Sequence, residues 1–158
     1  MQAQNKALDL AIKCMDTVRQ VFGNKGNIPE GFRSRARDIP SSLYYGGVLY
    51  TLAYVASKAS KDKASGDDLL MQAFLRDDVG ALFKEWFEKK LVEDEAYELY
   101  GVCLMRALRE LVGISKANSL TDILRMLNDP GMRVIAERRL LEFTEWLKRL
   151  AEAVVQKG

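Results

Sequence analysis

Two tyrosines and a lysine at intervals of four residues, Tyr50, Tyr54 and Lys58, form the most distinctive constellation in the sequence. In a helix this spacing places the three side chains on one face. Aromatic rings beside a lysine can bind single-stranded nucleic acid by stacking on bases and contacting phosphates. The same residues also suit packing in a core or at a subunit interface, with the lysine matching the helix dipole. The spacing leaves both hypotheses open.

Further basic residues could contact an anionic partner. Lys61 follows Lys58 near the expected end of the same helix, while Arg33 and Arg37 share a helical face from which Arg35 points away. These cations are candidates for binding the phosphates of a nucleic acid.

A second basic group lies near the C-terminus. Lys148 and Arg149 are expected on the outer side of the last helix, where Glu145 is spaced for a local ion pair with Arg149. Trp146 lies off the apolar seam of that helix and would be either peripheral core or an anchor for a partner subunit.

Catalysis is not indicated. The chain contains no histidine, which removes the commonest general base and metal ligand. Gly23–Gly26 lacks the spacing of a phosphate-binding loop. The acidic groups Asp67-Asp68, Asp77-Asp78 and Glu93–Glu95 are typical of helix starts, where the dipole favours negative charge, rather than of metal ligands. We expect no metal and no cofactor.

Charge is unevenly distributed. The net charge of +2 arises from +5 over residues 1–63, −5 over 64–113 and +2 over 114–158. Such a pattern suits an anionic partner or head-to-tail contact between copies, although folding could equally mix the charges on the surface. Cys14 and Cys103 form no metal-binding pair and are expected to be buried thiols in the cytoplasm. Neither a secretory signal nor a membrane-spanning run is indicated.

Apolar side chains recur at three- and four-residue steps, which predicts an all-α protein. We expect one domain over residues 1–158, a compact bundle of about six to eight helices. Pro40 would kink or break the second helix, and Gly46-Gly47 would end it and allow close approach of the next. The apolar run after Gly47 should be buried, with the long C-terminal helix as its packing partner. The expected helices cover 3–22, 30–45, 48–61, segments starting near 67, 80, 93 and 119, and 132–157.

Two segments resemble the small subunit of the type III-B CRISPR Cmr effector complex. The first is Pro40 followed by Gly47-Val-Leu-Tyr-Thr-Leu-Ala-Tyr-Val-Ala-Ser-Lys58, which is similar to that family's proline and Gly-Leu-x-x-(Ala/Thr)-Leu-Ala-Phe segment ending in a basic residue. The second is Glu145-Trp-Leu-Lys-Arg-Leu-Ala151, similar to its Trp-hydrophobic-basic-basic-aromatic-Ala segment. The departures from the pattern are Val48, Tyr54 and Leu150, each of which stays apolar or aromatic.

The resemblance implies a non-catalytic helical subunit of an RNA-guided antiviral complex. Copies would stack as the minor filament beside the backbone subunits and the large subunit, with guide and target RNA between the filaments. Cutting would belong to the backbone subunits. The resemblance supports Lys58, Lys148 and Arg149 as RNA contacts, because they fall on basic positions of the motifs. An adaptor that contacts only proteins is the alternative, and a nuclease or a DNA-binding regulator is a more distant one.

Overall fold

The polypeptide is α-helical, as predicted. The computed structural model describes residues 5–59 and 63–157, and within them the chain forms seven α-helices and one π-helical turn. The helices are α1 (Lys6–Phe22), α2 (Asn27–Lys58), α3 (Gly66–Leu75), α4 (Val79–Glu88), α5 (Tyr97–Ala107), α6 (Leu120–Leu127) and α7 (Pro130–Val154); the π-helical turn η1 (Leu108–Val112) follows α5.

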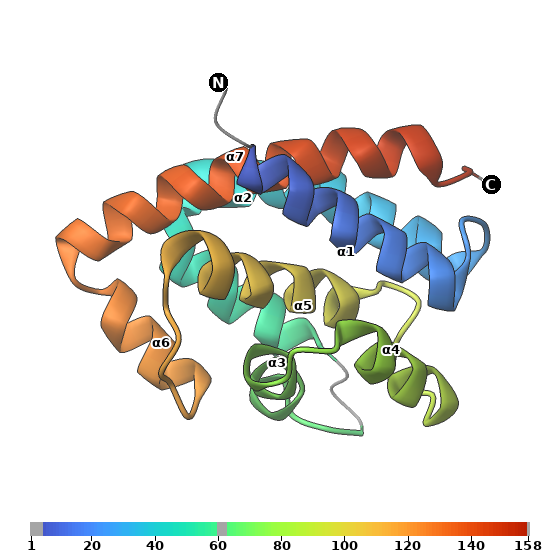
Figure 1. Cartoon of the computed structure of the whole chain (residues 1–158), viewed down its shortest axis with the longest axis horizontal. Coiled ribbons are helices and arrows are strands. Elements are labelled where there is room, and N and C mark those ends of the chain that lie inside the picture. The colour runs from blue at the N-terminus through green and yellow to red at the C-terminus, as the bar shows by residue number, and fades with distance from the viewer. Residues whose placement is uncertain (1–4, 60–62, 158) are drawn as a thin grey trace.

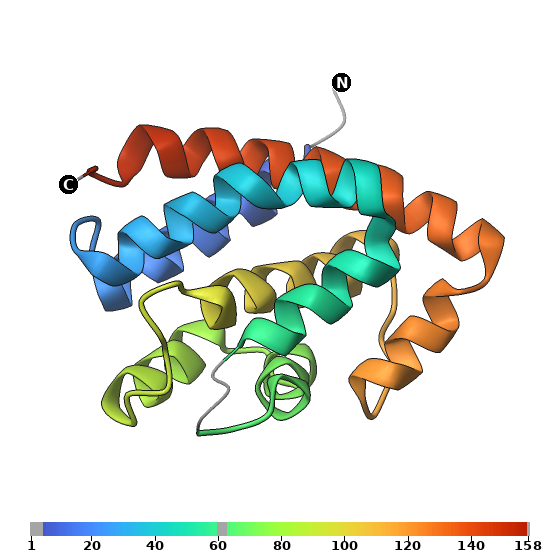
Figure 2. The ribbon, with the colours of Figure 1, turned by 180° about the vertical axis from the view of Figure 1, so that it is seen from behind.

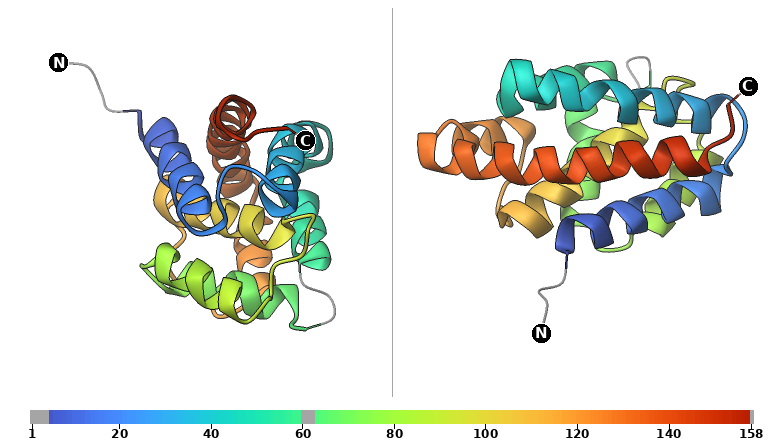
Figure 3. Two further views of the ribbon diagram at one scale, coloured as in Figure 1. Left: turned by 90° about the vertical axis from the view of Figure 1, so that its right-hand side faces the viewer. Right: turned by 90° about the horizontal axis from the view of Figure 1, so that it is seen from above.

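The long helices form one layer. α1, the first part of α2, and α7 lie side by side, and α5 runs beneath them (Figure 1; Figure 3). The shorter α3, α4 and α6 lie on the far side of α5, as the reverse view also shows (Figure 2). The amide of Gln156 donates to the carbonyl of Asn24 at 2.8 Å, so the end of α7 meets the loop between α1 and α2. α7 therefore runs antiparallel to the first part of α2 (Figure 3). The sequence had predicted α7 as the partner of the apolar run after Gly47, so that prediction was wrong for most of the run.

α2 bends at Gly47. Its φ of 85° and ψ of 169° interrupt the helix in a region that is essentially restricted to glycine. Pro40, which was predicted to kink or break the helix, lies buried inside it instead. The helix also begins earlier than predicted, at Asn27, because Pro29 fits a first turn whose amides need no intrahelical partner. The second part of α2 then leaves α7 and descends along the side of α5 (Figure 2).

α5 is the centre of the core. Every residue from Tyr97 to Met105 is buried. The acidic residues Glu93–Glu95 were expected to begin this helix, but they precede it, and Ala96 takes a left-handed conformation with φ of 58° at its start. The buried carboxylate of Glu98 accepts a hydrogen bond from the amide of Glu93 at 3.0 Å. The chain entering α5 is thereby held by a side chain of the helix itself.

The other acidic pairs lie where the dipole argument placed them. Asp67 and Asp68 are in the first turn of α3, and the side chain of Asp78 caps α4 by accepting from the amide of Ala81 at 3.0 Å. Ser119 accepts from the amide of Asp122 at 3.2 Å and so caps α6, which begins where the sequence predicted a helix near residue 119. Within 5–59 and 63–157, no group of three or more potential ligands could hold a metal ion.

The glycine pair does not bring two helix backbones together, so that prediction was wrong. A Cβ on Gly46 would meet only Tyr50 of its own helix, and one on Gly47 would lie 2.9 Å from a carboxylate oxygen of Glu137. The close backbone approaches occur elsewhere: a Cβ on Gly31 would collide with the carbonyl of Asp94, and one on Gly66 with that of Ala56.

The apolar run after Gly47 is buried on only part of its circumference. The buried side carries Val48, Leu52 and Val55, while Tyr50 is 60% exposed and Ala53 and Ser57 also face outward.

Candidate functional site

The tyrosines predicted on one face of α2 belong to a longer row of rings, here called the tyrosine row (Tyr50, Tyr54 and Tyr97). The rings of Tyr50 and Tyr54 are stacked with centroids 6.0 Å apart and planes at 20°. Tyr54 meets Tyr97 of α5 edge-on at 6.0 Å, and their hydroxyls lie 3.5 Å apart. The Lys58 ammonium lies 5.6 Å from the Tyr54 ring centre, and the Arg35 guanidinium 4.7 Å from that of Tyr97.

The tyrosine row is embedded at one end and open at the other. Tyr97 is 7% exposed, and burial together with the Tyr54 hydrogen bond raises the pKa of Tyr97 to about 12. Tyr54 is half-buried, whereas Tyr50 is largely exposed. Tyr54 therefore packs mainly within the protein, and Tyr50 is the ring that a partner can reach. Because Tyr97 lies 43 residues beyond Tyr54, sequence spacing could not have identified it.

Arg35 supports the inner end of the tyrosine row. Its side chain is 16% exposed, lies 3.5 Å from the Glu95 carboxylate and 3.9 Å from that of Asp38, and covers the Tyr97 ring. A guanidinium that is shared among these groups holds the loop before α5 against α2. The sequence correctly placed Arg35 on a different face from Arg33 and Arg37, but it gave no sign of these contacts.

The bend in α2 separates the predicted basic residues into two groups. Lys58 lies at the end of the descending part of α2, beside the tyrosine row and away from α7 (Figure 2). Lys61 lies outside the described residues. The remaining four cations belong to the layer formed by α2 and α7.

The contact between Val48 and Glu137 sets the register of these two helices. The Val48 amide donates to the Glu137 carboxylate at 3.0 Å. Arg37 lies eleven residues before Val48, and Lys148 lies eleven residues after Glu137. Because α2 and α7 are antiparallel, Arg37 and Lys148 are at the same level along the pair.

Helical geometry also gives the direction of these side chains. Eleven residues make about three turns, so Lys148 lies on the same flank of α7 as Glu137, which faces α2. Arg33 and Arg37 lie on the flank of α2 opposite Arg35, whose side chain reaches Glu95 before α5. This is the flank beside α7 (Figure 3). Arg33, Arg37 and Lys148 thus border one junction of two helices, here called the seam surface. Arg149, twelve residues after Glu137, is turned about a third of a circle away from that flank, onto the adjoining outer face of α7.

The charges on the seam surface and beside it are partly paired. Arg149 lies 3.6 Å from Glu152, one turn further along α7. The predicted partner was Glu145, one turn earlier. Arg37 lies 3.3 Å from Asp38. The Nε atom of half-buried Arg33 has no hydrogen-bond partner among the described residues. Exposed ion pairs of this kind are weak, so phosphates could compete for the arginines.

Trp146 lies on a different side of α7. It is 37% exposed, and nine residues from Glu137 turn it to the opposite flank. The structure therefore does not bring Trp146 together with the seam surface or with the tyrosine row.

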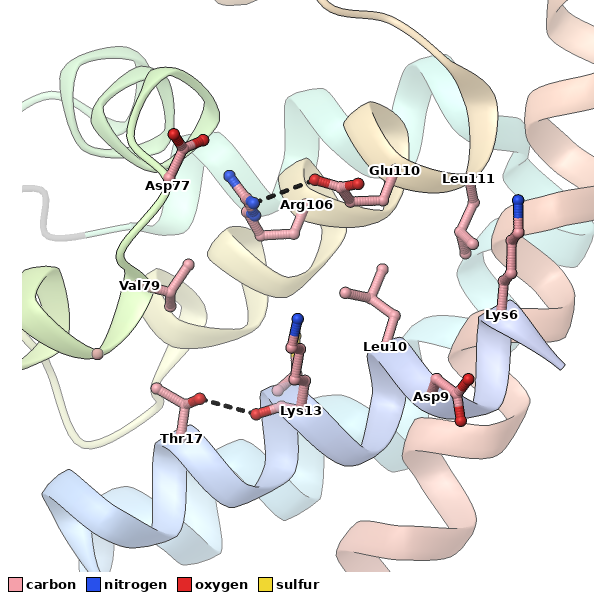
Figure 4. Close-up of a pocket in the computed structure, with 12 residues that line it drawn as sticks. Lys6, Asp9, Leu10, Lys13, Thr17, Asp77, Val79, Arg106, Glu110 and Leu111 are labelled. Atoms are coloured by element: carbon pink, nitrogen blue, oxygen red, sulfur yellow. Dashed lines mark hydrogen bonds and ion pairs between the residues drawn. The ribbon is translucent and has the colours of Figure 1, made fainter. Parts of the chain in front are cut away.

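A groove of about 620 Å³ lies between α1, α4 and the end of α5 (Figure 4). Lys6, Asp9 and Lys13 approach it from α1, and Arg106 and Glu110 form an ion pair of 3.1 Å across from them. Charges of both signs therefore line the groove. Sequence reasoning did not predict it, because its residues come from segments that are distant along the chain.

The groove does not resemble a catalytic centre. Cys14 lines it but is buried, and Cys103 is fully buried as well, which confirms the prediction of two free buried thiols. Burial and the neighbouring Cys14 thiol raise the pKa of Cys103, so it is disfavoured as a nucleophile. No helix in the described ranges has the length and hydropathy to span a bilayer.

Known proteins are similar to this chain over nearly its whole length. Among curated proteins, the chain is similar to the CRISPR system CMR subunit Cmr5 of Saccharolobus solfataricus, with 27% identity over 164 residues that cover 97% of this chain and 96% of that protein. Among solved structures, it is similar to a chain of the cryo-EM structure of the type III-B Cmr-beta complex bound to non-cognate target RNA. That chain has a TM-score of 0.66 and 20% identity, and the match covers 99% of this chain and 100% of that one.

The family comparison is the most direct. Residues 4–154 match the family described as CRISPR-associated protein (Cas_Cmr5). This match contains both segments on which the resemblance was based, and it extends over the middle of the chain, where the sequence offered no motif. The protein therefore belongs to the Cas_Cmr5 family of CRISPR-associated proteins.

Proposed function

We propose that this protein is the non-catalytic small subunit of a type III-B CRISPR effector complex and that it contacts RNA through the seam surface. Copies of the chain stack as the minor filament beside the backbone and large subunits. The complex that contains the similar chain is described as bound to target RNA, which supports this assignment. The observation that carries the RNA contact is the placement of Arg33, Arg37 and Lys148 along one junction of α2 and α7, with Arg149 on the adjoining outer face of α7.

The seam surface suits weak contact with a phosphate backbone. Arg33 and Arg37 are about 6 Å apart along α2, and Lys148 faces them from α7. Such a row of cations binds phosphates whatever the base sequence is. This is expected of a subunit whose target is selected by base pairing. Individual contacts would be weak, and repetition along stacked copies would multiply them.

The other predicted residues serve protein contacts in this proposal. Tyr50 presents an exposed ring stacked on Tyr54, and Trp146 presents an aromatic side chain on the other flank of α7. Exposed aromatic residues of this kind are enriched at protein interfaces. Lys58 is a second basic site, beside the tyrosine row, and Lys61 remains a candidate RNA contact on its sequence alone. The separation of Lys58 from the seam surface makes the contributions of the two sites separable by mutation.

Charge reversal in a reconstituted complex tests the proposal. The double variant Arg37→Glu/Lys148→Glu should weaken target RNA binding and make the plot of log K against log salt less steep by about 1.4 for each copy of the chain on the RNA, because each lost phosphate contact removes about 0.7. Lys58→Glu tests the second site. Lys84→Glu, an exposed lysine on α4, is the matched control and should leave the slope unchanged.

An unchanged affinity and salt slope in the seam variant, with the complex fully assembled, would exclude RNA contact at this surface. The chain would then be an adaptor that contacts only proteins. A separate incubation of the purified protein with RNA and Mg²⁺ or Mn²⁺ tests the absence of catalysis, and any cleavage would contradict it.

A further inference from the structure

Two adjacent tyrosines at the bend of α2 are unusually open to solvent. Tyr44 is 68% exposed and Tyr45 is 85% exposed. Their rings lie edge to face, with centroids 5.0 Å apart and planes at 85°. Neither side chain belongs to the core, so the fold does not account for two large rings at these positions.

Helical geometry places Tyr44 on the seam surface. It lies seven residues after Arg37 and eleven after Arg33, which are two and three turns of the helix. All three side chains therefore share the flank of α2 that borders α7 (Figure 3). The tyrosines form the end of the seam surface at the bend, about 10 Å beyond Arg37.

The neighbours of the tyrosines leave their faces accessible. Ser41, one turn before the tyrosines, and Gly46, directly after them, are small and exposed. The helix is then interrupted at Gly47. A flat base can approach a ring whose flanking side chains are this small. Because the rings are perpendicular, the outer face of Tyr45 is not covered by Tyr44.

We infer that Tyr44 and Tyr45 form a stacking platform for unpaired bases of an RNA strand whose phosphates lie along the seam surface. The inference rests on the proposed function, since the arginines orient the strand toward the tyrosines. Cations and aromatic rings on one helix flank are the combination that binds single-stranded nucleic acid without sequence preference. The adjacent cations favour an anionic strand over an apolar protein partner.

Removal of the rings tests the inference in the reconstituted complex. Tyr44→Leu/Tyr45→Leu should weaken binding of target RNA about tenfold, because stacking contributes up to a few kcal/mol per base. The salt slope should stay unchanged, since no phosphate contact is lost. Tyr44→Phe/Tyr45→Phe should retain affinity, and Phe87→Leu, at an exposed aromatic residue on α4, is the matched control. Target RNA carrying 2-aminopurine at successive positions should show quenching that the leucine variant abolishes.

The outcomes separate this inference from the proposed function. If the leucine variant binds normally while the seam charge reversal weakens binding, the platform is excluded and the RNA contact stands. If the leucine variant fails to join the complex, the tyrosines contact a protein subunit, and the inference is equally overturned. If neither variant affects binding, both the platform and the RNA-contacting seam are excluded.

Discussion

The Glu137 carboxylate of α7 accepts a hydrogen bond from the backbone amide of Val48 in α2, at 3.0 Å. Val48 is the first residue after the interruption at Gly47, so its amide lacks the partner that a continuous helix would provide. A side chain from another helix thus takes the place of a local cap. The interaction caps the second part of α2 at the bend and ties it to α7, with Arg37 level with Lys148.

Removing this carboxylate should destabilise the protein. We expect Glu137→Ala to lower the free energy of unfolding by about 1 kcal/mol, the usual effect of losing a helix cap and leaving an amide unsatisfied. Urea denaturation followed by circular dichroism measures this. Glu142→Ala, an exposed position on the same helix, is the control and should change stability little. Equal free energies of unfolding for the two variants would show that the Glu137 contact does not stabilise the fold.

The two neighbouring glycines should respond differently to alanine. Gly47 has positive φ, and a Cβ there would lie 2.9 Å from Glu137 Oε2, so Gly47→Ala should cost about 1–3 kcal/mol. Gly46 is helical and exposed, so Gly46→Ala should be neutral or stabilising by up to about 1 kcal/mol. Thermal unfolding of the two variants side by side tests this. Similar melting temperatures would contradict the assignment of the bend to Gly47.

These residues show what sequence patterns could and could not predict of the fold. Periodicity identified the helices, because an apolar stripe is a local property of the chain. The sequence also placed the end of the second helix at Gly46-Gly47, where α2 is interrupted, and a kink or break at Pro40, whose buried ring lies within the helix. The Glu137 carboxylate that accepts from the amide after the interruption lies 89 residues away, and no local pattern contains that contact.

The pH dependence of stability should reveal the buried end of the tyrosine row. Burial raises the pKa of Tyr97 from 10.0 to about 12. As pH rises from about 10 to 12, the unfolded chain releases the phenolic proton while the folded chain retains it, so unfolding becomes more favourable. We expect a loss of stability over this window that is smaller in Tyr97→Phe. Tyr45→Phe, at an exposed ring, should behave as the unmodified protein.

Chemical denaturation at a series of alkaline pH values measures this difference. Tyr100 is also buried with a raised pKa, so the comparison depends on the difference between the two variants and not on the total slope. Identical profiles for Tyr97→Phe and the unmodified protein would contradict a raised pKa at Tyr97.

The candidate site was predictable in part. The spacing of Tyr50, Tyr54 and Lys58 correctly placed them together, since neighbours within one helix follow from its geometry. Tyr97 and Arg35 were missed because they join the row only through contacts between α2, α5 and the loop that precedes α5. Likewise, Arg37 and Lys148 lie at the same height along the helix pair because α2 and α7 pack antiparallel. Neither sequence segment alone contains that information.

Gly101 offers a test of the core around α5. A Cβ at this position would lie 2.5 Å from Leu70 Cδ2 and 3.3 Å from Val55 Cγ1, so α2 and α3 close on the helix only because a side chain is absent. Gly101→Ala should therefore lower the free energy of unfolding by about 1–3 kcal/mol, despite the higher helix propensity of alanine. Equilibrium urea denaturation gives the value.

A second substitution distinguishes steric conflict from other causes. Leu70→Val removes the Cδ atoms and should cost about 1 kcal/mol in the unmodified background, because it leaves a small cavity. In the Gly101→Ala background the same change relieves the overlap, so the double variant should be more stable than the sum of the single effects predicts. Additive effects within about 0.5 kcal/mol would show that the two side chains do not compete for the same space, and would contradict the close packing of α3 against α5.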